Sequence, residues 1–454
     1  MAIKLLDAAR GPLSVTIVER RAELGRGVAY STTEPVHLVN GTAQIFGLHP
    51  NDPQHLVRWL TANGERHGWT LPVDLAQSSP PRWLYGTYVQ SELNRAVAEK
   101  TAGVSFVHVQ DEAIAVERSS SGFIVQAAGG ETIPADVVVL ATGVFPSTPT
   151  RAEAAVADDP RFVAVPWVPA ALDRLRDADN LLLVGASLSM VDVIASMEAR
   201  GFKGRYQVVS RRGQMVEGRR AVEPWRDFVA SAPLPRTVRE LLKRIRTEKA
   251  AMAETGTNWQ ALPVPLRAHV LDLWQAANDV ERRRFARHLR SFWDVALHRA
   301  APASYAFVER AKAEGRLDFA AGRLLSLAPQ PDGIAAQIRW RHSDTVEERL
   351  FDGVVNCRGH QEHDWRRVDA QLVRQLLASG TVRPHTTGFG IDATGEGAII
   401  DASGRVQSGL FAIGHPLRGV AWESSSIGEQ LAQAIALAPR LLAATAATSA
   451  LETA

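Results

Sequence analysis

The sequence predicts an α/β protein with two Rossmann-like dinucleotide-binding domains and a helical insertion. Two stretches support this prediction, 15–32 (VTIVERRAELGRGVAYST) and 180–201 (NLLLVGASLSMVDVIASMEARG). Each contains a short apolar run and then a turn of small residues, which is typical of the strand-to-turn junction of a nucleotide-binding unit. Because the second stretch lies inside the chain and strands return near its end, the first domain is expected to be split and the second inserted into it.

Composition limits the class of protein. The chain has 454 residues, enough for two or three domains, and 46% of them are hydrophobic. The net charge of +2 gives no field that would favour nucleic acid or a membrane surface. The single cysteine, Cys357, excludes internal disulfides and a CxxC redox centre. The first residues lack the apolar core of a signal peptide, so a soluble cytoplasmic protein is expected.

The first unit starts with 1–18 (MAIKLLDAARGPLSVTIV), whose early apolar residues are spaced for one face of a helix. A G-x-G-x-x-G phosphate-binding turn belongs about 20 residues before the acid of such a unit. Only 18 residues precede that acid, Glu19. We therefore expect the chain to begin inside the first crossover helix.

Glu19 is the most specific candidate site residue of this unit. A carboxylate at the carboxyl end of the second strand accepts hydrogen bonds from ribose hydroxyls. The alternative is a solvated glutamate at a strand end. The glycine-rich turn at Gly25, Arg26 and Gly27 and a polar loop around Asn40 are expected to approach the same ligand.

The following elements are assigned from periodicity and turn residues. Residues 51–55 are expected to cap a short helix, and 80–100 to form an amphipathic helix entered through two prolines. Strands are expected at 104–109 and 122–127, together forming a small β unit. Residues 136–143 (DVVVLATG) are expected to form a buried parallel strand that ends in a flexible turn.

That turn and a second one near the C-terminus supply further candidates. Ala141, Thr142 and Gly143 are small enough for a cofactor to pass close to the backbone, although a simple tight turn explains them equally well. Gly414 ends a strand in the same way. The helix after it is expected to start near Ile427 and to offer backbone N–H groups to an anion.

Residues 145–179 are rich in Pro and Asp and are expected to be a linker before the second unit. The turn of that unit, Gly185 to Ser189, keeps only the first glycine of G-x-G-x-x-G. The other residues are small, so Gly185, Ser187 and Ser189 are candidate cofactor contacts.

The next strand, 206–213, ends in Ser210, Arg211 and Arg212 and not in an acid. Arginines pair with a 2′-phosphate, whereas an acid would repel it, so NADPH is favoured over NADH. The alternative is a basic strand end that faces solvent.

Residues 224–316 contain no strand signal and are expected to be a helical insertion. Within it, Asp294 and His298 are four residues apart, so we expect them to share a helix face, either as a catalytic acid–base pair or as a structural pair. No metal site is expected, because His37, His49 and His55 lack ligand spacing on a helix and no cysteines are paired.

Several blocks together resemble the bacterial FAD/NAD(P)-binding protein family with two dinucleotide-binding domains, over Met1 to about Ala438. The blocks, in chain order, are GRGVAYST with HLVN, NDPQHLVRWL, RWLYGTY, VGASLSMVD, SRRG, WDVALHR, VVNCRG and FAIGHPLRGVAWES. The resemblance implies FAD in the split first domain and NADPH (or NADH) in the inserted one. Members with assigned activities are FAD-dependent, NAD(P)H-consuming monooxygenases, including a urate hydroxylase and amine N-hydroxylases.

Two departures from the family pattern stand out. The family's first strand and GxGxxG turn would lie before Met1. His415 stands where many flavoproteins have an Asp after the final glycine, which holds the ribityl chain. The expected domain boundaries are 1–150 and 351–440 for the two parts of the FAD domain, 151–223 and 317–350 for the NAD(P) domain, 224–316 for the helical insertion, and 441–454 for a loose tail.

The resemblance implies an oxidoreductase in which NADPH reduces FAD, molecular oxygen forms a flavin hydroperoxide, and a small-molecule substrate is hydroxylated. Two alternatives stay open: a flavin reductase or dehydrogenase without oxygenation, and a truncated dinucleotide-binding protein without catalysis. No residue of the helical insertion indicates a particular substrate.

Overall fold

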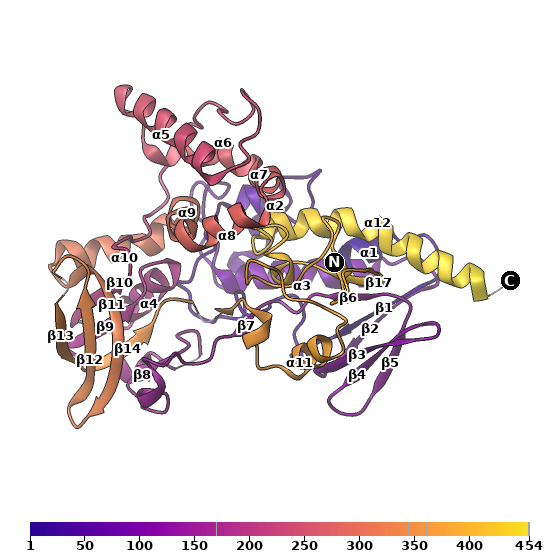
Figure 1. Cartoon of the computed structure of the whole chain (residues 1–454), viewed down its shortest axis with the longest axis horizontal. Helices are drawn as coiled ribbons and strands as arrows, with labels where there is room; N and C mark the ends of the chain where they lie inside the picture. Colours follow the sequence, from indigo (N-terminus) through magenta and orange to yellow (C-terminus); the bar gives the residue numbers. More distant parts are fainter. Residues whose placement is uncertain (169, 344, 360, 453–454) are drawn as a thin grey trace.

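The computed structural model describes residues 1–168, 170–343, 345–359 and 361–452. Two α/β units lie at opposite ends of the long axis, and helices α5 (Val238–Glu254) and α6 (Pro263–Ala268) project from the middle (Figure 1). The mixed α/β architecture with two parallel-strand units confirms the predicted fold class.

The first unit begins with helix α1 (Ala2–Ala8), as the apolar spacing predicts. Strand β1 (Leu13–Val18) follows and pairs in parallel with β2 (Val104–Val109), Leu13 lying opposite Val104. Helix α2 (His55–Asn63) lies between them in sequence and has no side-chain cap, in contrast to the predicted capping residues. Helix α3 (Arg82–Ala98) is entered through Pro81, as expected.

The C-terminal part of the chain completes this unit. Strand β6 (Val138–Leu140) pairs in parallel with β17 (Val406–Ala412), which in turn pairs with β16 (Ala398–Ile400). Residues 272 positions apart, such as Val138 and Leu410, thus share one sheet, and the first unit is split as predicted.

Two sheet predictions for this region are wrong. The strand at Gly122–Ala127 (β4) does not form a unit with β2. It pairs with β3 (Ala113–Ser119) and β5 (Thr132–Ala135) in an antiparallel sheet, whereas β2 pairs in parallel with β1 in a separate sheet. Strand β6 is also only partly buried, because the edge that does not pair with β17 lines a large cavity.

The free edges of β1 and β6 line this cavity from two sides, and the described residues contain no strand between them. The sheet of the first unit is therefore in two pieces, β1–β2 and β16–β17–β6.

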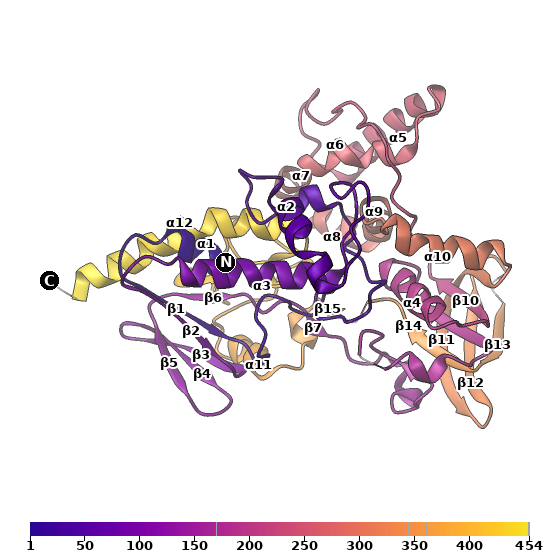
Figure 2. The same cartoon turned by 180° about the vertical axis from the view of Figure 1, so that it is seen from behind.

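The second unit contains a seven-stranded sheet (Figure 2). Its order is β13 (Val346–Phe351), β12 (Gly333–Trp340), β11 (Leu317–Gln330), β10 (Arg205–Ser210), β9 (Asn180–Val184), β14 (Gly353–Asn356) and β8 (Phe162–Val163). Strands β9 and β10 with helix α4 (Leu188–Ala199) form the predicted βα unit.

Two boundaries differ from the expected ones. Strand β14 lies next to β9, so it belongs to the second unit and not to the 351–440 segment of the first. Strand β8 comes from the expected linker, where the short strand β7 (Phe145–Pro146) also pairs with β15 (Gln361–Glu362). Strands β7 and β8 have two residues each, which is too short for a periodic signal, whereas the unit to which β14 belongs depends on its pairing with β9 and not on local pattern.

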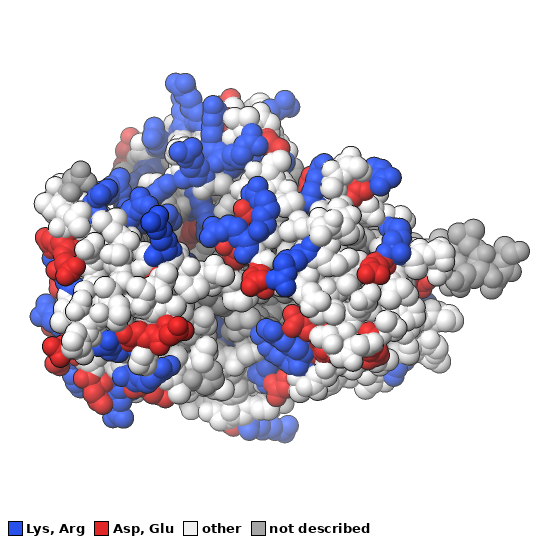
Figure 3. Space-filling model, turned by 60° about the horizontal axis from the view of Figure 1, so that its bottom comes forward, with Lys and Arg blue, Asp and Glu red and all other residues white. Residues whose placement is uncertain are grey.

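Between the sheets the described residues 224–316 are helical or irregular, as predicted. After α5 and α6 the helices are α7 (Val270–Ala276), α8 (Asp279–His288), α9 (Arg290–Leu297) and α10 (Pro302–Ala313). Helix α10 packs on α4, whereas α5 to α9 surround an aromatic core that includes Trp274, Phe285 and Trp293. Lys and Arg side chains gather over the upper part of the surface in Figure 3, and acidic ones are scattered elsewhere.

The chain ends in helix α12 (Ile427–Glu452), which follows α11 (Gln371–Ala378) and β17. The loose tail predicted for 441–454 is therefore wrong for the described residues up to Glu452. The segment is rich in alanine, the strongest helix former, and Pro439 is tolerated within the helix. None of the described helices combines the length and the apolar character that crossing a membrane requires.

A buried ion pair joins the two units. Arg82 of α3 donates from both terminal nitrogens to Asp192 of α4, at 2.8 and 3.2 Å, and its Nε donates to the carbonyl of Leu38. Nearby, Ser196 Oγ lies 2.9 Å from His37 Nε2, and Arg200 binds Glu34. These contacts hold α4 of the second unit against α3 and the loop at residues 34–38 of the first.

Candidate cofactor and active site

One cavity of about 3910 Å³ runs between the two units. It is lined by most of the predicted site residues, namely Glu19, Gly25, Arg26, Gly27, Asn40, Ala141, Thr142, Gly143, Ser187, Ser189, Arg211, Asp294, His298, His415 and Ile427. Gly185, Arg212 and Gly414 are not among the described residues that line it. Candidates from both nucleotide units therefore face one space.

Glu19 directly follows β1 at the edge of the cavity. Its backbone N–H donates to the carbonyl of Val109, which holds the strand end against β2. Its Oε1 accepts a hydrogen bond from the backbone N–H of Arg21 at 3.0 Å. The carboxylate is partly exposed, so its second oxygen can accept a bond from a ligand hydroxyl.

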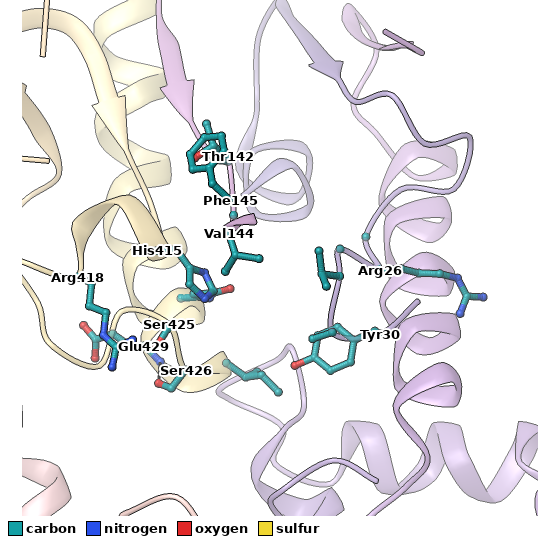
Figure 4. Close-up of a pocket in the computed structure, with 18 of the residues that line it drawn as sticks. Arg26, Tyr30, Thr142, Val144, Phe145, His415, Arg418, Ser425, Ser426 and Glu429 are labelled. Atoms are coloured by element: carbon teal, nitrogen blue, oxygen red, sulfur yellow. Dashed lines mark hydrogen bonds between the residues drawn. The ribbon is translucent and has the colours of Figure 1, made fainter. Parts of the chain in front are cut away.

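The turn after Glu19 is held against α3. Gly25 has φ of +84°, and a Cβ there would lie 3.0 Å from Val89. The Arg26 guanidinium turns away from the cavity and donates to Trp83 O and Thr87 Oγ1 (Figure 4). Arg26 thus anchors the turn, and the ligand-facing groups are the backbone of the turn and Tyr30.

Thr142 lies at the end of β6, where the sequence predicts close approach of a cofactor. Its Oγ1 is buried and has no hydrogen-bond partner among the described residues. Gly143 follows with φ of +67°. A buried hydroxyl without a partner is costly, so this atom is suited to a ligand that donates or accepts a hydrogen bond there.

His415 faces the cavity from the turn after β17 (Figure 4). Burial, and next the Arg418 guanidinium, lower its pKa to about 4, so the imidazole is neutral at pH 7. Gly414 before it points its N–H at Gln433 Oε1, 2.9 Å away, and holds the turn on α12. Ser426 caps α12 through the N–H of Glu429, and Ile427 and Gly428 of the first turn line the cavity.

This burial of His415 predicts acid sensitivity. Its folded-state pKa lies below the unfolded value, so its contribution to stability is complete above pH 6.5 and is lost as the pH falls toward 4. Between pH 7 and pH 5 we expect the difference in unfolding free energy between wild type and His415→Gln to change by about 2 kcal/mol. Urea unfolding at both pH values measures it; parallel pH dependence in the two proteins would contradict the assignment.

In the second unit, the backbone conformation at position 185 and its close contact with Cys357 leave room only for glycine. The φ of Gly185 is +115°, and a Cβ would lie 2.6 Å from the carbonyl carbon of Cys357. Ser187 is the N-cap of α4 but makes no side-chain cap bond. Ser187, Leu188 and Ser189 at the start of α4 line the cavity, a position that suits a phosphate.

The two arginines after β10 diverge. Arg211 lines the cavity close to Arg290, Arg323 and Arg358, and partial burial and these cations lower its pKa. Arg212 does not line the cavity; it donates to the carbonyls of residues 287 and 288 and lies over Phe292. Only Arg211 is thus directed at a ligand in the cavity.

The predicted Asp294–His298 pair is not formed. Helix α9 ends at Leu297, and His298 is its C-cap in an extended conformation, so the two side chains do not share a helix face. Asp294 lies 3.4 Å from Arg290 and 3.9 Å from Arg418, whereas His298 lies 3.8 Å from Glu423.

Sequence reasoning missed Arg418, which is only 8% exposed. Its guanidinium lies over the rings of Phe389 and Trp422, and its Nε has no hydrogen-bond partner among the described residues. The only signal in the sequence is its place in HPLRG, directly after the predicted turn at His415.

Comparison with known proteins agrees with this architecture. Residues 1–145 match the model of an FAD-NAD(P)-binding family. A search of curated proteins finds no match. Among solved structures, ornithine hydroxylase from Pseudomonas aeruginosa is 14% identical, with a TM-score of 0.58 over 94% of this chain and 91% of that one.

Two further structures are similar. The FAD-bound cadaverine monooxygenase from Erwinia amylovora is 12% identical, with a TM-score of 0.63 over 97% of this chain and 91% of that one. An ornithine N-hydroxylase from Kutzneria sp. 744, solved with reduced FAD, NADP⁺ and L-ornithine, is 14% identical, with a TM-score of 0.57 over 97% and 95%. At such identities the likeness establishes the fold.

Proposed function

We propose that this chain is an FAD-dependent, NADPH-consuming monooxygenase that hydroxylates a small molecule, in keeping with the match of residues 1–145 to an FAD-NAD(P)-binding family model. The observation that carries the proposal is the single cavity lined by both nucleotide units. A nicotinamide and a flavin must meet for hydride transfer, and a shared cavity permits this. The structurally similar amine hydroxylases support the same reaction class.

The residues of the first unit fit FAD. Glu19 is placed for ribose hydroxyls, the positive-φ glycines of the turn leave room for a close ligand, and Thr142 offers an unpaired hydroxyl. The N-terminus of α12 and the turn at His415 line the cavity opposite the turn that carries Arg26 and Tyr30 (Figure 4). FAD supplies hydride acceptance and oxygen activation when bound.

The residues of the second unit fit NADPH. The N-terminus of α4 suits the pyrophosphate, and Arg211 with its neighbouring arginines suits a 2′-phosphate. Arg323 and Arg358 approach the same space from β11 and from the loop after β14.

The substrate is proposed to lie near His415, beneath the helical insertion. Trp274, Phe285, Trp293, Phe389 and Trp422 pack into one aromatic cluster that excludes water behind Arg418. The neutral His415 imidazole has one N–H donor and one nitrogen acceptor, so it can form a hydrogen bond with a reacting group. Arg418, with its unpaired Nε, can orient a polar group of the substrate.

A flavin-binding and turnover assay tests the proposal. We expect the purified chain to quench flavin fluorescence on titration with FAD and to oxidise NADPH only when FAD is present. L-ornithine, L-lysine, cadaverine and urate serve as substrate probes, with hydroxylated product and hydrogen peroxide measured together. Product formation supports a monooxygenase; NADPH oxidation that yields only peroxide with every probe assigns a flavin reductase, and failure to bind FAD contradicts both.

A further inference from the structure

Outside the cavity, the fold gathers two histidines and a glutamate. His49 and His55 lie on either side of the short loop that leads into α2, and Glu92 projects from the middle of α3. These histidines lack ligand spacing in the sequence, because the third group comes from a helix about 40 residues further along the chain. Only the packing of the loop on α3 brings the three together.

The distances between the three groups suit a metal ion. His49 Nε2 lies 2.7 Å from Glu92 Oε2, and His55 Nε2 lies 3.9 Å from Glu92 Oε1. The three potential ligand atoms all lie within 4.8 Å of one another. Tetrahedral ligands about 2.0 Å from Zn²⁺ are about 3.3 Å apart. The 2.7 Å contact is a hydrogen bond that an ion would replace, and the 3.9 Å separation closes to this spacing with a small side-chain movement.

Neighbouring groups fix two of the three side chains. Arg95 Nε donates to Glu92 Oε2 at 3.1 Å, and His49 Nε2 is hydrogen-bonded to the same oxygen at 2.7 Å. Oε1 accepts no hydrogen bond among the described residues, so it is the oxygen that is open to an ion. Tyr88 Oη lies 2.9 Å from His55 Nδ1, which leaves the Nε2 side of the ring toward Glu92. Hydrogen-bonded partners of this kind orient the ligands of metal sites.

The loop itself is constrained and accessible. Pro50 and Pro53 lie between the two histidines, and a backbone N–H of Asp52 donates to His49 O. His49 and His55 each keep about a quarter of their side chains exposed (25% and 24%), whereas Glu92 is 5% exposed. An ion can thus reach the cluster from solvent, and water can complete its coordination.

We propose that His49, His55 and Glu92 bind one divalent transition-metal ion, with Zn²⁺ as the preferred ion of this ligand set and a fourth position left to water. Two imidazoles and one carboxylate are a recognised zinc ligand set, and zinc ranks high in affinity among divalent first-row metals. None of the three residues lines the cofactor cavity, and the site lies where the start of α2 and the loop before it pack on α3.

Calorimetric titration of the full chain with ZnSO₄ tests this proposal. The affinity tag is removed and the protein is first treated with chelator. We expect one Zn²⁺ to bind per chain and to raise the thermal unfolding midpoint. His49→Ala and Glu92→Gln are each expected to weaken binding at least about 100-fold, and Tyr88→Phe, which keeps all three ligands, about 10-fold.

A neighbouring histidine gives the matched control. His67 stacks on Trp59 on the same side of the unit but lies outside the cluster, so His67→Ala should bind zinc as the wild type does. His49 is on a partly exposed loop, and His49→Ala should fold even if Glu92→Gln does not. Absence of zinc binding in the wild type, or unchanged stoichiometry and affinity in His49→Ala, would overturn the proposal.

Discussion

Arg82→Ala is expected to lower the free energy of unfolding by about 3–5 kcal/mol, the usual cost of removing one partner from a buried ion pair. The Asp192 side chain is 6% exposed and that of Arg82 is 11% exposed. Without Arg82, the Asp192 carboxylate loses two hydrogen bonds from the guanidinium, and the carbonyl of Leu38 loses a donor. Guanidinium chloride unfolding followed by circular dichroism measures the loss.

Two further variants separate charge burial from general disruption. Replacing both partners, Arg82→Met with Asp192→Leu, removes the unpaired charge and should recover most of the loss. Arg58→Ala removes an exposed ion pair with Asp52 and should have a far smaller effect. If Arg82→Ala shifts the transition no more than Arg58→Ala, the pair does not hold the two units together.

The nucleotide-binding units were predictable because each depends on local pattern. An apolar run that ends at Glu19, and a second that ends at Gly185, place a strand and a turn without knowledge of distant contacts. The split of the first unit also followed from the order of strands along the chain. The absence of strands from the helical insertion was predictable in the same way, from uninterrupted helical periodicity.

Side-chain direction was not predictable from these patterns. Arg26 and Arg212 both belong to predicted turns, yet each guanidinium is bonded to carbonyls outside the cavity. His298 lies just beyond the end of α9, where a boundary error of one residue removes it from the helix face. Arg418 and Glu92 depend on tertiary packing, for which spacing in sequence holds no information.

The contrast between Arg211 and Arg212 leads to the second large prediction. Arg211 faces the cavity among cations from three other elements, so it is the arginine placed for a 2′-phosphate. Arg211→Glu replaces charge-assisted hydrogen bonds with repulsion. We expect the dissociation constant for NADPH to rise about 100-fold, because hydrogen bonds to charged groups contribute about 1.5–3 kcal/mol each.

NADH carries no 2′-phosphate, so its dissociation constant should change little, and the preference should move from NADPH toward NADH. Fluorescence titration of the reduced coenzymes measures both constants without requiring turnover. Arg212→Glu is the matched control: its guanidinium is occupied by the carbonyls of residues 287 and 288, so a much smaller loss of NADPH affinity is expected. An equal loss for both coenzymes in Arg211→Glu would indicate damage to the fold near β10, and would contradict a 2′-phosphate site at this residue.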